Sequence, residues 1–562
     1  MRCATNLTRH RWQLPRWGTC VFLIASSCLA PMRARAEGPA VSYLFPTTVT
    51  IGVETEVQVK GTFANWPPQA WTSEPGLHVT PADESGKLTV AAAATCVPGL
   101  AWLRFYDETG ASQVKAIGLT SFPSKLEATA APPPNDTQVL DVPTVVHGRL
   151  AKNDEVDSYL VHAEQGHTLV ARLDSHFDFQ TPMDGVLQIC TRDGVVLAQN
   201  DDARGLDPIC TYQVPTAGDY LVRCFAFPAS PNSAIRFAGG DDYVYALYVS
   251  TGPWVEYALP LAGRDDESTD YELVGWNLTQ SRELLSARPL PHQRTSNLWQ
   301  TGVLTTADGR GHVVPLTSWP LVVGSEDDDG SRRTIEIPSI TSGYLSRADS
   351  AHEYEFEVAA GQKLEFLVES QSLGFELDSW VEVFDDSGTT VASNDDQKKA
   401  LDSRLEHEFT NGGTYRVHIR DRFRHGGLRH AYRLTVRPAT PDFLLELATG
   451  EHQTDVGKSL EVEVQVRRLG GCPWPIRVEA RGIPGDATIV AESQPEGDSA
   501  NSVKLTLPGS DTPSSLPWEI VGIVDDENQA IQDREVKATF ATPHPQWRLS
   551  QCWLTVAAGA KP

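Results

Sequence analysis

The chain has 562 residues, of which 47 are basic and 73 acidic, and its formal net charge is −26. A surface this acidic repels nucleic acid and anionic membranes, so it excludes a nucleic-acid-binding role and favours cations or neutral polymers as partners. Solubility alone accounts for the same charge, and composition does not choose between the two explanations.

Residues 1–36 have the pattern of a secretory signal peptide. Arg9, Arg11 and Arg16 form a basic start, residues 18–29 are apolar but too short to span a bilayer, and Ala34-Arg35-Ala36 is a typical cleavage site. We therefore expect export to the periplasm, cell envelope or exterior, with no membrane insertion after cleavage. A retained anchor and a lipoprotein on Cys28 are the alternatives. Without these residues the net charge is −32.

The rest of the chain shows the two-residue alternation of strands. Runs such as Glu56–Lys60, Tyr354–Val358 and Leu460–Val466 alternate apolar and polar residues, with Gly, Pro, Asn or Asp between runs. We therefore predict an all-β protein: a string of five β-sandwich domains, jelly-roll-like and immunoglobulin-like.

An internal repeat organises these strands. Val41–Pro46 matches Val255–Pro260, and in both copies a glycine follows (Gly61 and Gly275). Downstream, Asn200-Asp201-Asp202 matches Asn394-Asp395-Asp396 within a longer series of matches in the same order. Residues 41–250 and 255–437 thus read as two copies of a two-domain unit.

The repeat and the linkers predict the domain boundaries. Residues 130–137 (AAPPPNDT) form a stiff, proline-rich connector. The predicted segments are a signal peptide (1–36), an Ig/IPT-like sandwich (37–123), a linker (124–140), a jelly-roll-like sandwich (141–251), a second Ig/IPT-like sandwich (252–336), a second jelly-roll-like sandwich (337–438) and a C-terminal Ig-like sandwich (439–562).

The downstream half of each copy resembles the bacterial pre-peptidase C-terminal (PPC) domain. The first copy carries Asp157-Ser-Tyr159, Asp193-Gly194, Asn200-Asp201-Asp202 and Gly218-Asp-Tyr220 in the order of that family's pattern. The second copy has the same series, with His352 in place of Asp157.

The upstream halves resemble IPT-like immunoglobulin domains, and the whole arrangement is similar to envelope proteins of planctomycete-type bacteria. The PPC resemblance implies jelly-roll-like sandwiches that accompany secreted peptidases, with substrate-binding or maturation roles, and a relationship to calcium-holding collagen-binding modules.

The acidic loops of the two copies are candidate metal sites. Calcium takes six to eight oxygen ligands, and carboxylates gathered on one turn supply them. The candidate ligands are Asp184, Asp201, Asp202 and Asp207 in the first copy and Asp378, Asp395, Asp396 and Asp402 in the second. Plain turn-forming roles for Asn and Asp are the alternative. Calcium is the only cofactor we expect.

A basic loop stands out in the second copy. Residues 420–430 hold four arginines and two histidines, with Gly426-Gly427 as a hairpin tip. Arg420, Arg422, Arg424 and Arg429 are candidate ligand-binding residues for a sulfated or carboxylated polymer. An intramolecular role, pairing with an acidic face of the same chain, is the alternative.

Six cysteines follow the signal peptide, an even number that permits three disulfides in an exported protein. Cys472 and Cys552 are a plausible pair because both fall in the last domain. None has the C-x-x-C spacing of zinc or thioredoxin-like sites.

No catalytic motif stands out. His352-Glu353 lacks the second histidine of a zincin, and neither a G-x-S-x-G elbow nor a Walker loop occurs. We expect a non-catalytic binding or adhesion-type protein that recognises an extracellular polymer (glycan or fibrous protein) or an envelope protein. A structural or peptidase-associated accessory component of an envelope assembly is the alternative, and a cryptic hydrolase stays open.

Overall fold

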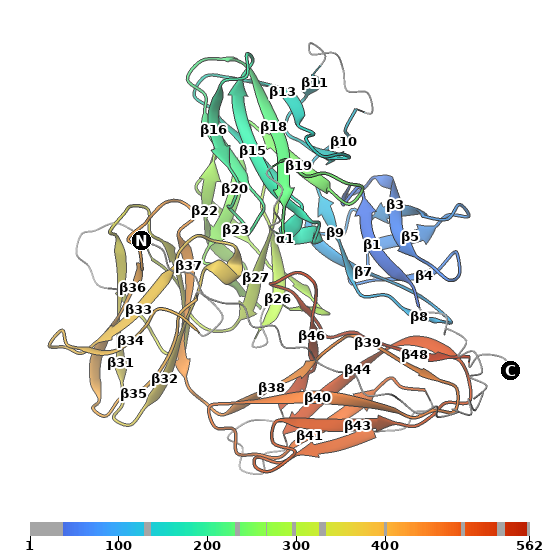
Figure 1. The fold of residues 1–562 in the computed structure, drawn as a ribbon. Helices are drawn as coiled ribbons and strands as arrows, with labels where there is room; N and C mark the ends of the chain where they lie inside the picture. The colour runs from blue at the N-terminus through green and yellow to red at the C-terminus, as the bar shows by residue number, and fades with distance from the viewer. Residues whose placement is uncertain are drawn as a thin grey trace, which may run out of the picture. The chain divides into compact units, whose positions relative to one another are not determined.

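The computed structural model describes residues 38–128, 137–230, 236–265, 267–294, 299–324, 333–397, 402–484, 489–524 and 534–558. The predicted signal peptide lies outside the described residues. Strands dominate the described chain, as predicted, with one four-residue α-helix and one short 3₁₀ helix. Neither helix in the described ranges has the length and apolar character that crossing a membrane requires. The strands pair into ten sheets, which form five sandwiches (Figure 1).

Sandwich 1 forms from short strands whose buried residues alternate, as in the pair Val57 and Val59 on β3 (Glu54–Thr62), an inner strand of its first sheet. The first sheet has the order β1 (Ala40–Phe45), β3 (Glu54–Thr62), β6 (Lys87–Ala92), β5 (Leu77–Pro81). The second has β2 (Thr48–Thr50), β9 (Lys115–Thr120), β7 (Gly99–Asp107), β4 (Gln69–Thr72), with β8 (Gly110–Ala111) paired to β7.

Sandwich 2 contains two five-stranded sheets and the α-helix α1 (His176–Phe179). One sheet has the order β10 (Ser124–Leu126), β12 (Thr144–Arg149), β19 (Val244–Ser250), β14 (Thr168–Asp174), β17 (Ile209–Gln213). The other has β11 (Gln138–Leu140), β13 (Asp157–Ala163), β18 (Gly218–Pro228), β15 (Met183–Thr191), β16 (Val196–Asn200).

Sandwich 4 repeats this order strand by strand and has the 3₁₀ helix η1 (Gln371–Leu373) where sandwich 2 has α1. Its sheets are β28 (Leu321–Val323), β30 (Ser339–Tyr344), β37 (Ala431–Pro438), β32 (Lys363–Glu369), β35 (Arg404–Glu408), and β29 (Arg333–Thr334), β31 (Ala351–Val358), β36 (Gly413–Asp421), β33 (Ser379–Phe384), β34 (Thr390–Asn394). The first pair of each sheet is parallel in both sandwiches. The predicted repeat is therefore visible in the topology.

Sandwich 3 repeats sandwich 1 with fewer strands: in the described residues its first sheet has three strands instead of four, and its second sheet has no counterpart of β8. Its sheets are β20 (Trp254–Leu259), β22 (Thr269–Trp276), β23 (Arg282–Leu285), and β21 (Gly263–Arg264), β27 (Gly311–Thr317), β26 (Gln300–Thr305), β24 (Arg288–Leu290). The repeated glycines have a steric reason. A Cβ on Gly61 or Gly275 would lie 2.0 Å from the carbonyl oxygen of Ala40 or Trp254, next to a register shift that both sandwiches share.

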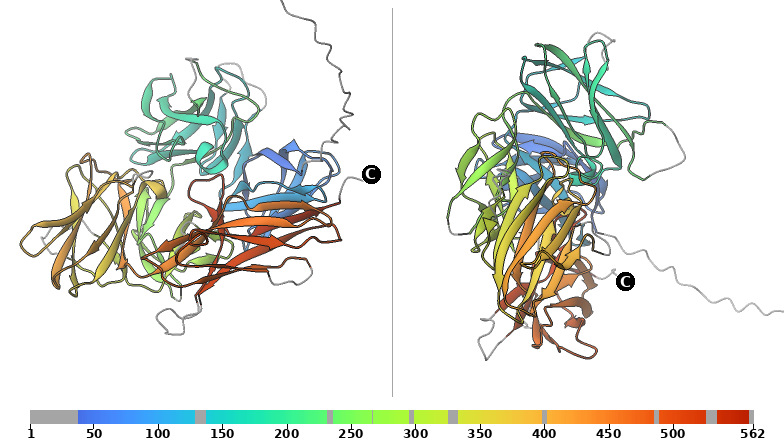
Figure 2. Two further views of the ribbon diagram at one scale, coloured as in Figure 1. Left: turned by 60° about the horizontal axis from the view of Figure 1, so that its bottom comes forward. Right: turned by 90° about the vertical axis from the view of Figure 1, so that its left-hand side faces the viewer.

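Sandwich 5 is the C-terminal domain, whose long strands are orange and red in Figure 2. One sheet has the order β25 (Gln293–Arg294), β47 (Arg548–Leu549), β46 (Thr539–Ala541), β38 (Asp442–Leu447), β40 (Leu460–Leu469), β43 (Ser502–Leu507). The other has β39 (Glu451–Asp455), β48 (Cys552–Ala557), β44 (Ser514–Val524), β41 (Ile476–Arg481), β42 (Ile489–Ser493), with β45 (Arg534–Lys537) paired to β44.

Several strands cross the boundaries drawn from the sequence. β10 and β11 both fall within the predicted linker 124–140, yet each joins a sheet of sandwich 2. β25 falls by sequence in the predicted segment 252–336, which forms sandwich 3, but it pairs with β47 of sandwich 5. Residues 37–562 accordingly form one compact unit, and a single apolar cluster includes Trp102, Trp254 and Trp518 of three different sandwiches.

His352, which stands in the second copy where the first has Asp157, keeps the same hydrogen-bonding geometry. In sandwich 2 the Tyr245 hydroxyl donates to Asp157 (2.6 Å) and lies 2.6 Å from the Tyr159 hydroxyl. In sandwich 4 the Tyr432 hydroxyl lies 2.7 Å from His352 Nδ1, next to Tyr354. The imidazole nitrogen therefore takes the place of the carboxylate as the polar partner of a buried tyrosine pair.

The six described cysteines are all free and buried. The expected Cys472–Cys552 disulfide is therefore absent, although both side chains belong to the same apolar cluster. Cys472 packs instead beside Arg468, 3.7 Å from its Nη1. Burial raises the pKa of Cys552 and of Cys210 to about 12, so neither thiol supplies the thiolate that disulfide exchange needs.

Buried His147 on β12 predicts an acid-sensitive fold. Among the described residues neither ring nitrogen has a hydrogen-bond partner, and burial lowers the pKa of His147 to about 4. The unfolded chain, with a histidine pKa near 6.5, binds the proton first as the pH falls, so the folded state loses stability from pH 6.5 down to about 4. One such group accounts for about 3 kcal/mol.

We expect His147→Leu and the wild type to have the same free energy of unfolding at pH 7.5, measured with denaturant. Below pH 6.5 the free energy of unfolding of the variant should become progressively larger than that of the wild type. If the free energies of unfolding of the two proteins changed in parallel from pH 7.5 to 4.5, His147 would not be the source of the acid sensitivity.

Candidate functional site

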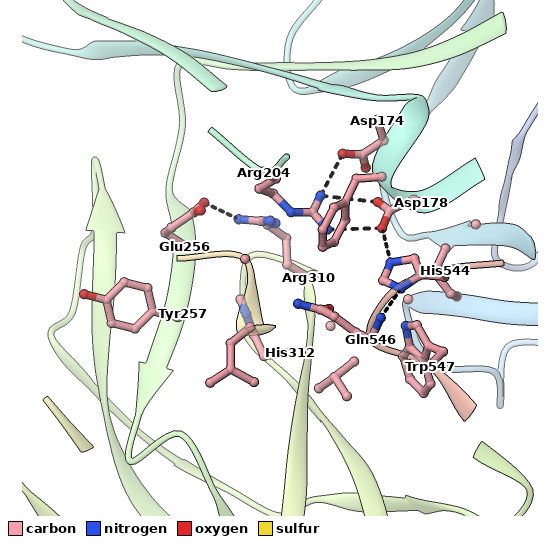
Figure 3. A pocket seen from close by; sticks show the side chains of 18 of the residues that line it. Asp174, Asp178, Arg204, Glu256, Tyr257, Arg310, His312, His544, Gln546 and Trp547 are labelled. Carbon is pink, nitrogen blue, oxygen red and sulfur yellow. Dashed lines mark hydrogen bonds and ion pairs between the residues drawn. The ribbon is translucent and has the colours of Figure 1, made fainter. Parts of the chain in front are cut away.

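A cavity of about 710 Å³ lies where all five sandwiches contribute residues, and we call it the central cavity (Figure 3). It is lined by β9 of sandwich 1, β14 and α1 of sandwich 2, β20 and β27 of sandwich 3, η1 of sandwich 4 and the 541–548 loop between β46 and β47 of sandwich 5. Pockets that bury a compact ligand span about 300–1,000 Å³, so the volume is suitable for one. Exposed Ser372 and Pro545 place part of the lining in contact with solvent.

Two buried carboxylates, both predicted as metal ligands, hold the helical turns that line the cavity. Asp207 accepts the backbone N–H groups of Ser175, His176 and Phe177 at 2.8–3.0 Å, which fixes the start of α1. Asp402 does the same at η1, accepting from Ser370, Gln371 and Ser372 at 2.9–3.2 Å. Each carboxylate satisfies the free N–H groups of a helical turn. Their oxygens are thus engaged with backbone donors.

The first ionic cluster joins sandwich 2 to sandwich 5. Arg204 donates to Asp174 (3.1 Å) and to Asp178 (3.1 Å), and Asp178 lies 3.2 Å from His544 Nε2 (Figure 3). Arg172 donates to Asp174 from the same strand at 2.6 Å. The His544 Nδ1 accepts the N–H of Gln546, so Nε2 carries the proton that His544 donates to Asp178.

The second ionic cluster joins sandwich 3 to sandwich 4. Glu256 pairs with Arg429 through a close contact, and its other oxygen lies 3.6 Å from Arg310 Nη1. Arg310 also stacks on the Trp254 ring, 4.1 Å from its centroid. Arg429 extends the cluster to Glu376 (3.2 Å) and donates to the Ala203 carbonyl of sandwich 2 (2.9 Å).

Asp178 and Glu256 are held in their ionised forms, whereas His312 is neutral. Burial alone would raise the pKa of Asp178, but Arg204 and the His544 bond hold it well below its usual range. Burial likewise opposes ionisation of Glu256, yet Arg429 and Arg310 lower its pKa to about 2. Burial and Arg310 lower the pKa of His312 to about 3, so that imidazole is neutral.

The 541–548 loop reaches both repeated sandwiches at equivalent places. His544 meets α1, where its ring lies edge-on to Phe177 with 4.7 Å between centroids. The Gln546 side chain donates to the Ser372 carbonyl of η1. Trp547, 3% exposed, is part of the cavity wall beside it. One loop therefore bridges the helical turns that Asp207 and Asp402 fix.

No protein-family model matches this chain, and no curated protein matches it. Among solved structures, the pre-peptidase C-terminal domain of a collagenase from Bacillus anthracis is 16% identical and covers 19% of this chain and 95% of that domain, with a TM-score of 0.16. A tetra-tandem repeat from the extending region of a large adhesion protein is 8% identical and covers 92% of this chain and 100% of that one, with a TM-score of 0.14.

A third similar structure is the Bacteroides ovatus protein SGBP-B of a mixed-linkage glucan utilization locus, solved with a mixed-linkage heptasaccharide. It is 11% identical and covers 70% of this chain and 94% of that one, with a TM-score of 0.12. At such TM-scores neither an arrangement of domains nor a function carries over, so the function has to come from this chain's own residues.

The other predicted metal ligands lie apart from the cavity in the acidic loops. In sandwich 2 burial raises the pKa of Asp184, and the nearby carboxylates of Asp202 and Asp201 raise it further. In sandwich 4 burial and Asp396 raise the pKa of Asp378, while Arg422 opposes them. Within the described ranges no three histidine, cysteine, aspartate or glutamate side chains are grouped as a metal ion requires. The calcium prediction thus stays a prediction.

The predicted ligand-binding arginines all contact residues of this chain. Arg420 donates to Glu382 (3.0 Å) and stacks on Trp380, 3.7 Å from the ring centroid. Arg422 pairs with Asp395 and lies 3.6 Å from Asp396.

Exposed Arg424 lies 3.5 Å from Asp349. Arg429 alone of the four lines the central cavity. These contacts agree with the intramolecular alternative for the basic loop.

Apart from Arg429 and Asp402, the residues that line the cavity were not predicted from the sequence. Asp174, Asp178, Glu256, Arg310 and His544 are spread over 371 positions and fit no spacing motif. One signal was available: Arg204 is the single basic residue among the acids of the 201–207 loop, and it is the residue that pairs with both aspartates.

Proposed function

We propose that the chain is an exported, non-catalytic binding protein and that the central cavity holds its ligand. The observation that carries the proposal is the state of the charges in that cavity. Asp178 and Glu256 are each held ionised by arginines, and His312 is neutral far below physiological pH. A general acid or base needs a pKa near the working pH, and these three groups have theirs well outside it. Burial raises the pKa of Asp207 to about 7, but Asp207 is 1% exposed, does not line the cavity and has its oxygens occupied by backbone N–H groups.

A binding role uses the same features well. Arginines, carboxylates and amides held in fixed positions present hydrogen-bonding groups without reorganisation, and the aromatic wall supplies apolar contact. The ligand is an extracellular polymer, glycan or fibrous protein, or an envelope protein, of which one short segment enters the cavity.

The test is titration calorimetry of the mature chain with soluble polymer fragments: neutral and acidic oligosaccharides and a collagen-like peptide. We expect one fragment class to bind with a dissociation constant in the micromolar to millimolar range and to be recovered intact by mass spectrometry. Cleavage of the bound fragment by the purified chain would overturn the non-catalytic assignment. Failure of all classes to bind would overturn the cavity as the ligand site.

The second candidate is a structural or peptidase-associated component of an envelope assembly. Exposed aromatic residues favour it: Phe227 is 37% exposed next to Phe225 and Phe237 on sandwich 2, and Phe423 is 62% exposed on sandwich 4. Such residues suit contact with another protein. Recovery of a defined protein partner from envelope extract, lost in Phe227→Ser and Phe423→Ser, would favour this candidate.

Calcium is proposed only as a stabiliser. If it binds, the first copy is the better site, because Arg422 already compensates the carboxylates of the second. We expect calcium to raise the melting temperature and EDTA to lower it, with Asp184→Asn/Asp202→Asn insensitive to both. Equal melting temperatures in calcium and in EDTA would show that calcium does not stabilise the protein.

A further inference from the structure

The arginines that line the central cavity are balanced by carboxylates that pair with them. Arg172 and Arg204 face Asp174 and Asp178 in the first cluster, with all four side chains 16% exposed or less. In the second cluster Arg310 and Arg429 share Glu256, and Arg429 has Glu376 as well.

Arg433, also in the lining, pairs with Glu369 at 2.8 Å. Each arginine named here has its carboxylate.

This balance disfavours a charged occupant. An anionic ligand would bring an extra negative charge into a desolvated site whose arginines are already compensated by carboxylates, and burying an ion without a counter-charge of its own costs several kcal/mol. A cationic ligand would meet the same cost, because the carboxylates are already compensated by arginines. The net charge of −26 on the whole chain opposes the approach of an anionic polymer as well.

A neutral ligand with many hydroxyl groups meets neither penalty. Carboxylate oxygens that are paired on one side still accept hydrogen bonds on the other, and a guanidinium has five N–H donors. Neighbouring hydroxyls on a sugar ring donate hydrogen bonds to the carboxylates and accept them from the guanidiniums. The C–H faces of the ring pack on aromatic side chains, which the lining supplies as Tyr257, Phe375 and Trp547.

Two glutamines lie where such a ligand would enter. Gln371 of η1 and Gln546 of the 541–548 loop both line the cavity and are half-buried, beside exposed Ser372. A primary amide offers both donors and an acceptor without a charge. Gln546 already spans from sandwich 5 to the Ser372 carbonyl of sandwich 4, so it lies across this part of the rim.

We propose that the central cavity binds a neutral oligosaccharide, read by the paired charges of its wall and by the amides of Gln371 and Gln546 at its rim. The proposal rests on the proposed function, since it names the ligand class of the same site. About 710 Å³ admits a few linked sugar rings rather than a long chain. The site thus recognises a chain end or a side branch of a larger glycan.

The experiment is calorimetric titration of the mature chain with neutral hexasaccharides of glucose, mannose and N-acetylglucosamine, and in parallel with hexagalacturonate and a heparin hexasaccharide. We expect at least one neutral sugar to bind and neither acidic sugar to do so. Affinity for the neutral sugar should be unchanged between 50 and 300 mM salt, because no net charge is exchanged.

The variants separate the site from the fold. Gln371→Ala/Gln546→Ala is expected to weaken binding about tenfold or more, the equivalent of about 1.4 kcal/mol. The matched control, Gln465→Ala on the exposed face of β40, leaves affinity unchanged. Each variant must keep the wild-type melting temperature within a degree or two. If the double variant does not, the single variant Gln371→Ala decides, because within the described residues only the Gln546 side chain of the two, and not that of Gln371, donates a hydrogen bond to another sandwich.

Each outcome decides something. Binding of an acidic sugar or the collagen-like peptide, weakened by the glutamine variants, overturns the neutral-sugar assignment but keeps the cavity as ligand site. Neutral-sugar binding that the variants leave untouched places the sugar elsewhere and overturns the inference. If no probe binds, both the inference and the proposed function fail.

Discussion

Replacing Arg204 with methionine is expected to lower the free energy of unfolding by about 3–5 kcal/mol, the largest effect we foresee for a single side chain. The substitution keeps most of the side-chain volume and leaves Asp174 and Asp178, each 7% exposed, with Arg172 as their remaining guanidinium. The second carboxylate then stays charged in the interior or takes up a proton, and either way the folded state loses free energy. Denaturant unfolding of the variant and the wild type at pH 7 measures this loss in the free energy of unfolding.

Two controls make the result specific. Arg192→Met removes an arginine from the same sandwich, but Arg192 is 68% exposed and its 2.8 Å pair with Asp219 is a surface pair, so the expected loss is below 1 kcal/mol. Adding Asp178→Asn to Arg204→Met should recover part of the loss, since it removes the unpaired charge. Equal losses for Arg192→Met and Arg204→Met, without recovery, would show that the cluster is not a desolvated ionic network.

Asp207→Ala is expected to lower the free energy of unfolding by about 3 kcal/mol. Three backbone N–H groups at the start of α1 lose their acceptor in a place that water reaches poorly, since Asp207 is 1% exposed. Burial raises the pKa of Asp207 to about 7, so the carboxyl is only partly ionised at neutral pH, and each of the three hydrogen bonds contributes about 1 kcal/mol net. Asp402→Ala should have a similar effect through η1.

The same substitution separates capping from metal binding. If Asp207 acts as a cap, the loss is the same in calcium and in EDTA, and exposed Asp201→Ala in the same loop has little effect in EDTA. A loss for Asp207→Ala that appears only in calcium would restore its predicted role as a metal ligand. Thermal unfolding of the three proteins in both buffers gives the answer.

The fold was readable from the sequence because its signals are local. Strand alternation, such as that around Val57 and Val59, depends only on one face of a sheet being buried. The repeated Gly61 and Gly275 mark a place where a neighbouring backbone leaves no room for a Cβ, and such a constraint persists in both copies. The two-residue strand β25 was not foreseeable, because its partner β47 lies about 250 residues away.

Most of the site could not be predicted from the sequence, because its contacts join residues that are far apart in the chain. The prediction gave Asp207 to calcium because its neighbours in sequence are acidic, but its partners are backbone N–H groups some thirty residues upstream. Arg429 was identified as a binding residue, yet its role depends on Glu256, 173 positions away. Ion pairs between domains leave no periodicity in a single sequence, so no spacing rule finds them.

The contact between Asp178 and His544 joins residues 366 positions apart. Contacts between residues far apart in sequence require the closure of a long loop and form more slowly than contacts between neighbouring strands. Sandwich 2, whose strands all lie within residues 124–250, should therefore fold before its cavity wall meets the last domain. Interdomain closure should be the final event in the folding of this protein, slower than the folding of any one sandwich. A refolding experiment that follows Trp547 should show it as a separate late phase.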